Sequence, residues 1–103
     1  MTERELEAKV KELGLTAPRI TPELVDAEIT DAQYWRVPDT TVTVCALTLK
    51  NGFVLIGKSG AASYENFNEG IGKSVAYDNA RDQVWQLLGF RLKDALVKSI
   101  KEA

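Results

Sequence analysis

The chain has 103 residues, of which 45% are hydrophobic, so it can form one domain with a modest core. Thirteen basic and fifteen acidic side chains give a net charge of −2, which disfavours a protein that binds nucleic acid through its phosphate backbone. The absence of histidine excludes a His-containing catalytic triad and a His-ligated zinc site.

Composition also limits the compartment and the chemistry. A single cysteine excludes an internal disulfide, which agrees with a reducing environment. No apolar stretch is long enough to span a bilayer, and the N-terminus lacks the apolar segment of a signal peptide. We therefore expect a cytoplasmic protein with no membrane partner, and we expect neither a metal nor a cofactor.

Two short helices are predicted in the first third of the chain. Thr2, followed three residues later by glutamate, has the spacing of a capping box and predicts a helix over residues 3–13. Thr21 followed by Pro22 has the pattern of a second N-terminus, with a helix that runs to about residue 29.

The segment that follows is harder to assign. Residues 30–39 mix Tyr34, Trp35 and Pro38. Aromatic residues favour a strand, whereas proline is confined to edge strands and turns. We expect this segment to be a loop or a short edge strand.

The stretch GFVLIGKS, residues 52–59, matches the phosphate-binding pattern G-x-x-x-x-G-K-[ST]. A phosphate loop needs a curled backbone between its glycines, but here those four residues are large and apolar and predict a strand. Asn51 and Gly52 between two apolar runs indicate a tight hairpin turn instead. We therefore expect no binding or hydrolysis of ATP through Lys58.

The hairpin predicts two faces. If Asn51 and Gly52 form a two-residue turn, Lys50 pairs with Phe53. The core face then carries five residues: Cys45, Leu47, Leu49, Val54 and Ile56. The opposite face is also too apolar for water, because it carries Val42, Val44, Ala46, Phe53 and Leu55. We expect a helix or a second copy to cover it, and we expect Cys45 to be a buried hydrophobic residue and not a nucleophile.

From about Asn68 the pattern is helical. One apolar face, which we expect to pack on the hairpin, comprises Ala76, Ala80, Val84, Leu87 and Leu88. Gly89 predicts a break, followed by an amphipathic tail helix with apolar residues at positions 92, 96 and 100. Ile71, Val75 and Trp85 project from the other side of the main helix. Either the tail helix or a partner chain could cover them.

Polar side chains cluster where the hairpin end is expected to meet the helix start. They are candidates for a small-ligand site: Lys58 or Lys73, with Ser59, Tyr64, Asn66, Tyr77 and Asn79. The alternative is that such residues satisfy backbone groups in turns and at a helix cap.

The region from about Ile20 to Leu96 resembles a small tailed-phage protein family labelled by gene products 49 and 66 of two enterobacterial phages. The shared pattern is a TVC-x-L-x-L-x-NGF hairpin, a G-x-S, an N-F loop, G-x-x-x-A-Y-x-N-A, and W-x-L-x-G-aromatic-x-L. Together with Ile20, Thr21 and Pro22, the matching positions are Thr43, Val44, Cys45, Leu47, Leu49, Asn51, Gly52, Phe53, Gly57, Ser59, Asn66, Phe67, Gly72, Ala76, Tyr77, Asn79, Ala80, Trp85, Leu87, Gly89, Phe90 and Leu92.

Three positions depart from that pattern. Ala46 stands where many members have a second cysteine, Leu88 where an acid is common, and Phe90 where tyrosine is common. The resemblance implies a phage or prophage origin and a role inside the host cell, but it brings no established activity.

The sequence thus predicts one α+β domain over residues 1–103, in which residues 1–19 are an N-terminal helix and linker and residues 20–96 are the family-like region. Two kinds of function stay open: a non-enzymatic protein that binds, and could inhibit, a host or phage protein, and a protein that sequesters a small ligand or nucleotide. The apolar surplus also predicts a homodimer. The expected protein interface comprises Val42, Val44, Phe53, Leu55, Ile71, Val75 and Trp85.

Overall fold

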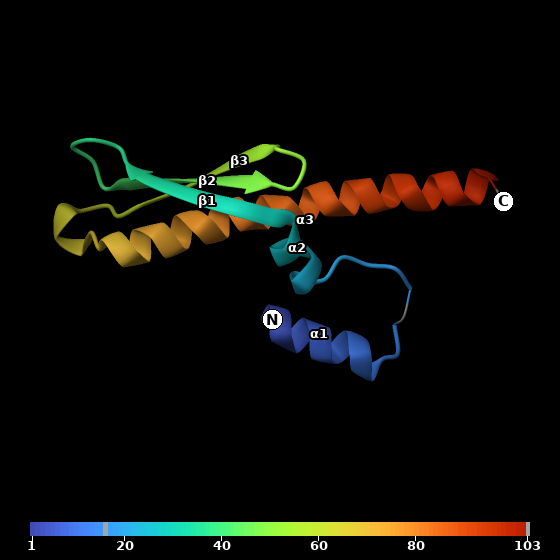
Figure 1. The fold of residues 1–103 in the computed structure, drawn as a ribbon. Coiled ribbons are helices and arrows are strands. Elements are labelled where there is room, and N and C mark those ends of the chain that lie inside the picture. The colour runs from blue at the N-terminus through green and yellow to red at the C-terminus, as the bar shows by residue number, and fades with distance from the viewer. Residues whose placement is uncertain (16, 103) are drawn as a thin grey trace.

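The computed structural model describes residues 1–15 and 17–102 and confirms the α+β class (Figure 1). Two short helices precede a three-stranded antiparallel sheet, and a long helix follows it. In chain order the elements are α1 (Glu3–Glu12), α2 (Pro22–Glu28), β1 (Ile29–Arg36), β2 (Val42–Leu49), β3 (Val54–Gly60), the 3-10 turn η1 (Tyr64–Asn66) and α3 (Glu69–Glu102).

Both N-terminal helices begin where the sequence predicts. The Thr2 hydroxyl accepts a hydrogen bond from the Glu5 backbone N–H at 3.1 Å, and the Thr21 hydroxyl accepts one from Leu24 at 3.2 Å. Each threonine thereby satisfies a backbone donor that the first turn of a helix leaves free.

The sheet has the strand order β1-β2-β3, with both neighbouring pairs antiparallel. Of the two alternatives for residues 30–39, the edge strand is right, although at eight residues it is not short. Pairing of Trp35 with Val44 and of Tyr34 with Cys45 gives the segment a ladder that its local pattern does not reveal.

The hairpin is present, but its predicted register is wrong by one residue. Leu49 N–H donates to the Phe53 carbonyl at 2.8 Å, and Gly52 N–H donates to the Leu49 carbonyl at 2.9 Å. Gly52 has φ +87°. The connection is therefore a three-residue loop whose last residue is left-handed, not a two-residue turn.

This shift exchanges the faces of β3, because successive side chains in a strand point to opposite sides. Leu55 pairs with Leu47 and is 8% exposed, so its assignment to the interface is wrong. Val54 and Ile56, which we expected in the core, are 49% and 52% exposed.

The predicted break at Gly89 is also wrong, because α3 is one helix of 34 residues without a separate tail helix. A glycine inside a helix costs only about 1 kcal/mol relative to alanine, and no proline follows it. The end of α3 projects beyond the sheet and does not fold back (Figure 1). Trp85 instead lines a shallow cavity with Leu6 of α1 and Pro22 of α2, so the N-terminal segment partly covers it.

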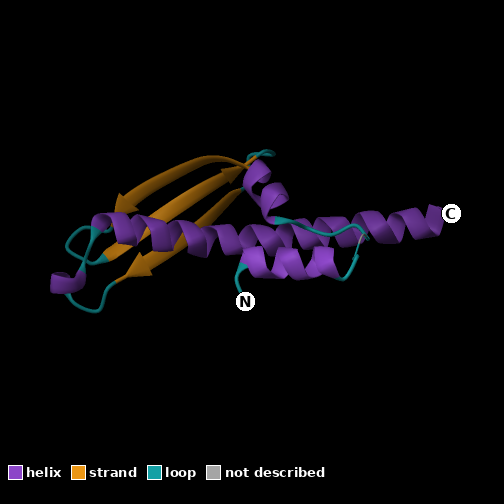
Figure 2. Cartoon of the chain, turned by 90° about the horizontal axis from the view of Figure 1, so that it is seen from below, coloured by secondary structure: helices purple, strands orange, loops and turns teal. Residues whose placement is uncertain are grey.

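The core lies between the inner face of the sheet and α3, which runs obliquely across the strands (Figure 2). Of the helix face predicted to pack on the hairpin, four residues are buried and Leu87 is exposed. The prediction that Cys45 is buried is confirmed. The buried apolar residues are Val25, Cys45, Leu47, Leu49, Leu55, Ala76, Ala80, Val84 and Leu88.

Polar contacts hold α1 to the rest of the molecule. Arg81 of α3 contacts Glu3 of α1 at 2.5 Å and Asp26 of α2 at 2.8 Å, and Arg19 contacts Glu7 at 2.7 Å. The hydrogen bonds to Asp26 and Glu3 raise the pKa of Arg81 above its ordinary value. Since α1 has no buried residue, these contacts on the surface contribute only modestly to stability.

Candidate interaction surface

The residues that resemble a phosphate loop join β3 to α3. A side chain on Gly57 would place its Cβ 2.3 Å from the Ala76 carbonyl oxygen, so the glycine allows the helix to approach. Lys58 N–H donates to the Asn79 side-chain oxygen at 3.0 Å, and the Ser59 hydroxyl donates to the Gly72 carbonyl at 2.6 Å. The segment is a strand held against a helix, as its apolar composition indicates.

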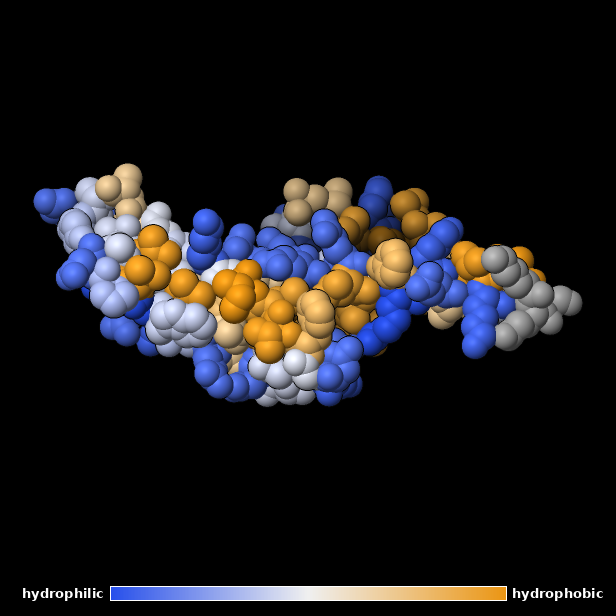
Figure 3. Space-filling view, turned by 90° about the horizontal axis from the view of Figure 1, so that it is seen from above, coloured by the Kyte–Doolittle hydropathy of each residue, from blue (hydrophilic) through white to orange (hydrophobic). Residues whose placement is uncertain are grey.

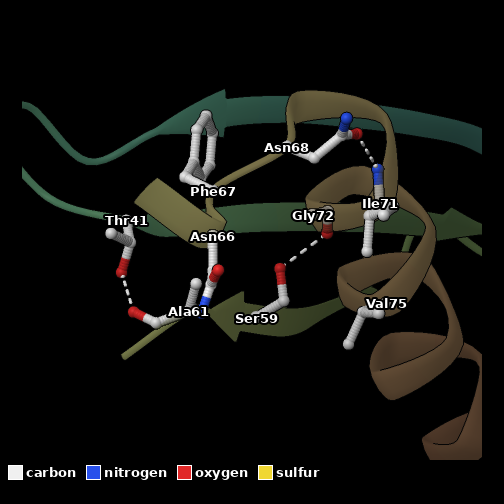
Figure 4. A pocket seen from close by; sticks show the side chains of 10 residues that line it. Thr41, Ser59, Ala61, Asn66, Phe67, Asn68, Ile71, Gly72 and Val75 are labelled. Carbon is white, nitrogen blue, oxygen red and sulfur yellow. Dashed lines mark hydrogen bonds between the residues drawn. The ribbon is translucent and has the colours of Figure 1, made fainter. Parts of the chain in front are cut away.

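A small hollow lies beside the start of α3, with a volume of about 170 Å³ (Figure 4). Three of its polar side chains bond to the local backbone: Thr41 donates to the Ala61 carbonyl, Ser59 donates to Gly72, and the Asn68 side-chain oxygen accepts from Ile71 N–H at 2.9 Å. Its volume is below the roughly 300–1,000 Å³ of ordinary small-ligand sites. The lining is Thr41, Ser59, Gly60, Ala61, Asn66, Phe67, Asn68, Ile71, Gly72 and Val75.

Two of the candidate ligand-binding residues, Ser59 and Asn66, line this hollow together. Lys58 pairs with Val44, which places its side chain on the outer face of the sheet. The Tyr64 hydroxyl donates to the Asp39 carbonyl and ties η1 to the turn after β1. Neither Lys58 nor Tyr64 is among the residues that line the hollow.

The other candidates also have contacts elsewhere. Asn79 accepts the Lys58 N–H, and Lys73 forms an ion pair with Glu69 at 3.2 Å. Tyr77 is half-buried and packs against the core. Burial is the main cause that raises the pKa of its phenol, and the negative charge of Asp26 raises it further. The predicted group of six side chains therefore does not converge on one cavity.

Cys45 has no features of a nucleophile. Its side chain is fully buried, and burial raises the pKa of its thiol. A thiol must ionise to react, so this environment opposes nucleophilic chemistry.

One apolar surface is the side of the sheet that faces away from α3, which we call the outer sheet face. Trp35 pairs with Val44 and Ala46 with Ile56, so these side chains lie together across all three strands. Trp35 is 49% exposed. Figure 3 shows apolar residues gathered over the sheet on this side. The outer sheet face comprises Trp35, Val42, Val44, Ala46, Val54 and Ile56.

The residues predicted as an interface are divided by the structure. Val42 and Val44 lie on the outer sheet face, and Phe53 is exposed at the end of the hairpin loop. Ile71 and Val75 are exposed on α3, beside the hollow. The core contains Leu55, and Trp85 packs against it.

Sequence reasoning missed three exposed apolar residues of this face, namely Trp35, Val54 and Ile56. The hairpin register hid Val54 and Ile56, because a two-residue turn assigns them to the core. Trp35 was missed because residues 30–39 could be either a loop or a short edge strand, so no face could be assigned to it. The adjacent Tyr34 and Trp35 must point to opposite faces of a strand, but the sequence does not show which of the two faces the core.

None of the helices in the described part of the chain combines the length and hydropathy needed to cross a bilayer. Within residues 1–15 and 17–102, no group of three or more Cys, Asp or Glu side chains is placed to hold a metal ion.

Comparison with known protein families gives a match. The model of a family described as Phage protein (N4 Gp49/phage Sf6 gene 66) matches residues 20–96. Neither the curated proteins nor the solved structures contain a match to the chain. The matched region begins after α1, the helix with no buried residue.

Proposed function

The chain belongs to the phage protein (N4 Gp49/phage Sf6 gene 66) family, and we propose that it acts in the cytoplasm of the host cell as a non-enzymatic binding protein. Its partner is another protein, of host or phage origin, and the outer sheet face is the docking surface. Inhibition of the partner would follow where this docking covers the partner's own functional surface.

The observation that carries the proposal is the outer sheet face itself. Soluble proteins rarely expose large contiguous apolar patches without a role in association. Here the exposed Trp35 lies beside the half-buried Val44, and the exposed Ile56 lies beside Ala46, the next outward-facing residue of β2. Tryptophan is also the residue type that most often dominates the binding energy of protein interfaces.

The surroundings of the polar residues support binding over catalysis. Cys45 is buried, and the Ser59 hydroxyl and the Asn79 amide are engaged in contacts between β3 and α3. In the alternative, a small ligand binds in the hollow beside α3, where the candidate residues Ser59 and Asn66 meet. A rise in melting temperature on addition of nucleotides would favour that alternative and count against a protein partner.

Two isoleucines allow a matched test. Ile56 on the outer sheet face is 52% exposed, and Ile71 on α3 is 65% exposed. Ile56→Lys and Ile71→Lys therefore introduce the same charge at similarly exposed positions. Affinity capture from bacterial lysate, with quantitative mass spectrometry, compares both variants with the wild type.

We expect the wild-type chain and Ile71→Lys to retain the same partner, and Ile56→Lys to lose most of it. Circular dichroism should show all three chains to be folded. Capture that is unaffected by Ile56→Lys, or that is lost with Ile71→Lys, would reject the outer sheet face as the docking surface.

A further inference from the structure

The two edges of the sheet differ. In an antiparallel ladder, alternate residues direct their backbone N–H and C=O groups toward one neighbouring strand or away from it. On the outward edge of β3, Lys58 N–H donates to the Asn79 side chain, and the Ile56 carbonyl accepts from the Gln83 side chain at 2.8 Å. Both side chains come from α3, so the helix caps this edge.

The outward edge of β1 has no such cap. Val37 N–H donates to the Val42 carbonyl at 3.0 Å, so the alternation directs Trp35 and Gln33 toward β2. The backbone groups of Ala32, Tyr34 and Arg36 then point away from the sheet. Among residues 1–15 and 17–102, no hydrogen bond reaches these outward groups.

We propose that β1 pairs with β1 of a second copy, antiparallel and across a two-fold axis, to form a six-stranded sheet. An open edge with unpaired donors and acceptors is a template for another strand. An antiparallel edge is complementary to itself, because the two-fold axis places each donor opposite the acceptor of the same strand in the other copy.

The side chains of β1 favour one register for this pairing. With Gln33 on the axis, Ala32 of each copy lies opposite Tyr34 of the other, so a small residue faces a large one. An axis through Tyr34 would crowd two phenol rings, whereas an axis through Ala32 would place two methyl groups together and leave a gap. The Gln33 register also places two exposed side-chain amides face to face, where the amide group that donates to Asp31 at 3.1 Å within one chain can instead bond to the amide of the other copy.

This pairing would join the outer sheet faces of the two copies. Trp35 lies two residues from the axis on the same face as Gln33, so the two indoles would lie on either side of the central Gln33 pair. Mass and cross-linking report on pairing at the β1 edge, whether or not the outer sheet face binds a foreign protein.

Cysteine cross-linking tests the register directly. With the axis at Gln33, the Gln33 residues of the two copies lie opposite each other, and their backbones do not hydrogen bond to one another. The Cβ atoms of such a pair lie about 4.5–5.5 Å apart, which is close to the distance that a disulfide needs. The native Cys45 is fully buried and should not compete. Lys58→Cys, exposed on the capped edge of β3, is the matched control for Gln33→Cys.

Under mild oxidation, we expect Gln33→Cys to form a covalent dimer at least ten-fold faster than Lys58→Cys, which is about 1.4 kcal/mol in activation free energy. Light scattering coupled to size-exclusion chromatography at micromolar concentration should give the wild type twice the chain mass of 11.4 kDa. Equal cross-linking rates, or a wild-type mass of one chain, would overturn the proposal.

Proline on the edge gives a second test. The Ala32 N–H points outward, so Ala32→Pro removes no bond of the ladder within the chain, and edge strands tolerate proline at such positions. We expect this variant to keep the wild-type circular dichroism spectrum and to have the mass of a monomer. A folded Ala32→Pro chain that stays dimeric would place the dimer contact elsewhere and reject the β1 edge.

Discussion

The close approach of α3 to Gly57 of β3 predicts that Gly57→Ala destabilises the fold. The new Cβ would lie 2.3 Å from the Ala76 carbonyl oxygen and 2.4 Å from the Ala80 nitrogen. Both are backbone atoms of α3, so neither can rotate away. To restore ordinary contact, the helix must retreat by about 1 Å.

The magnitude follows from three contributions. Forcing one extra methyl group into a packed core costs about 1–3 kcal/mol. Retreat of α3 also weakens the bonds from Asn79 to Lys58 and from Gln83 to Ile56, each worth about 1 kcal/mol. Loss of glycine's freedom in the unfolded chain offsets about 0.4–1 kcal/mol. The net loss should be about 2–3 kcal/mol.

Denaturation in urea, followed by circular dichroism, measures this loss as a lower transition midpoint. Gly60→Ala on the same strand is the control, because its Cβ would come closest to the movable Val42 side chain, at 3.3 Å, and would meet Thr41 only at ordinary distances of 3.7 and 3.8 Å. We expect the control to change stability by less than about 1 kcal/mol. A Gly57→Ala midpoint equal to that of the control would refute the role assigned to this glycine.

Four further outcomes follow from the structure. Gly52→Val should lower stability by about 1 kcal/mol or more, because φ +87° strains a β-branched residue; an unchanged melting temperature would contradict this. Thr43→Val should leave stability unchanged or raise it by about 1 kcal/mol in urea denaturation, since the buried Thr43 hydroxyl finds no hydrogen-bond partner among the described residues. Burial raises the pKa of Cys45 and Tyr34 from ordinary values of 9.0 and 10.0, so the unfolded chain ionises first and stability should fall as pH rises above about 9; a flat profile in pH-dependent denaturation would argue against their burial. Lys58→Ala should leave ATP hydrolysis at the background level of the wild type, and turnover that this substitution abolishes would restore the phosphate-loop reading.

Elements whose signals are local could be predicted from the sequence. The helix starts at Thr2 and Thr21 depend on one side chain bonding to a backbone group three residues away. The hairpin likewise follows from Asn51 and Gly52. Its register does not, because two-residue and three-residue loops fit the same letters, and a shift of one residue exchanges the two faces of the strand.

Features that depend on tertiary contacts were not predictable in the same way. β1 is stabilised by its ladder to β2 and shows weak local preference, so the exposure of Trp35 could not be foreseen. Gly89 resembles a helix end in isolation, yet the helix continues through it. The cap on β3 depends on Asn79 and Gln83, which meet the strand only once α3 packs beneath it.

Site-specific photo-crosslinking in bacterial cells tests the proposed docking surface most directly. A photoreactive amino acid is placed at Ile56 on the outer sheet face and, as the matched control, at Ile71 on α3. The proposal predicts that illumination links position 56 to a protein of different mass from the chain itself, and that position 71 gives no such product. A product formed from position 71 alone, or from neither position, would contradict the proposal that the protein acts by binding through its outer sheet face.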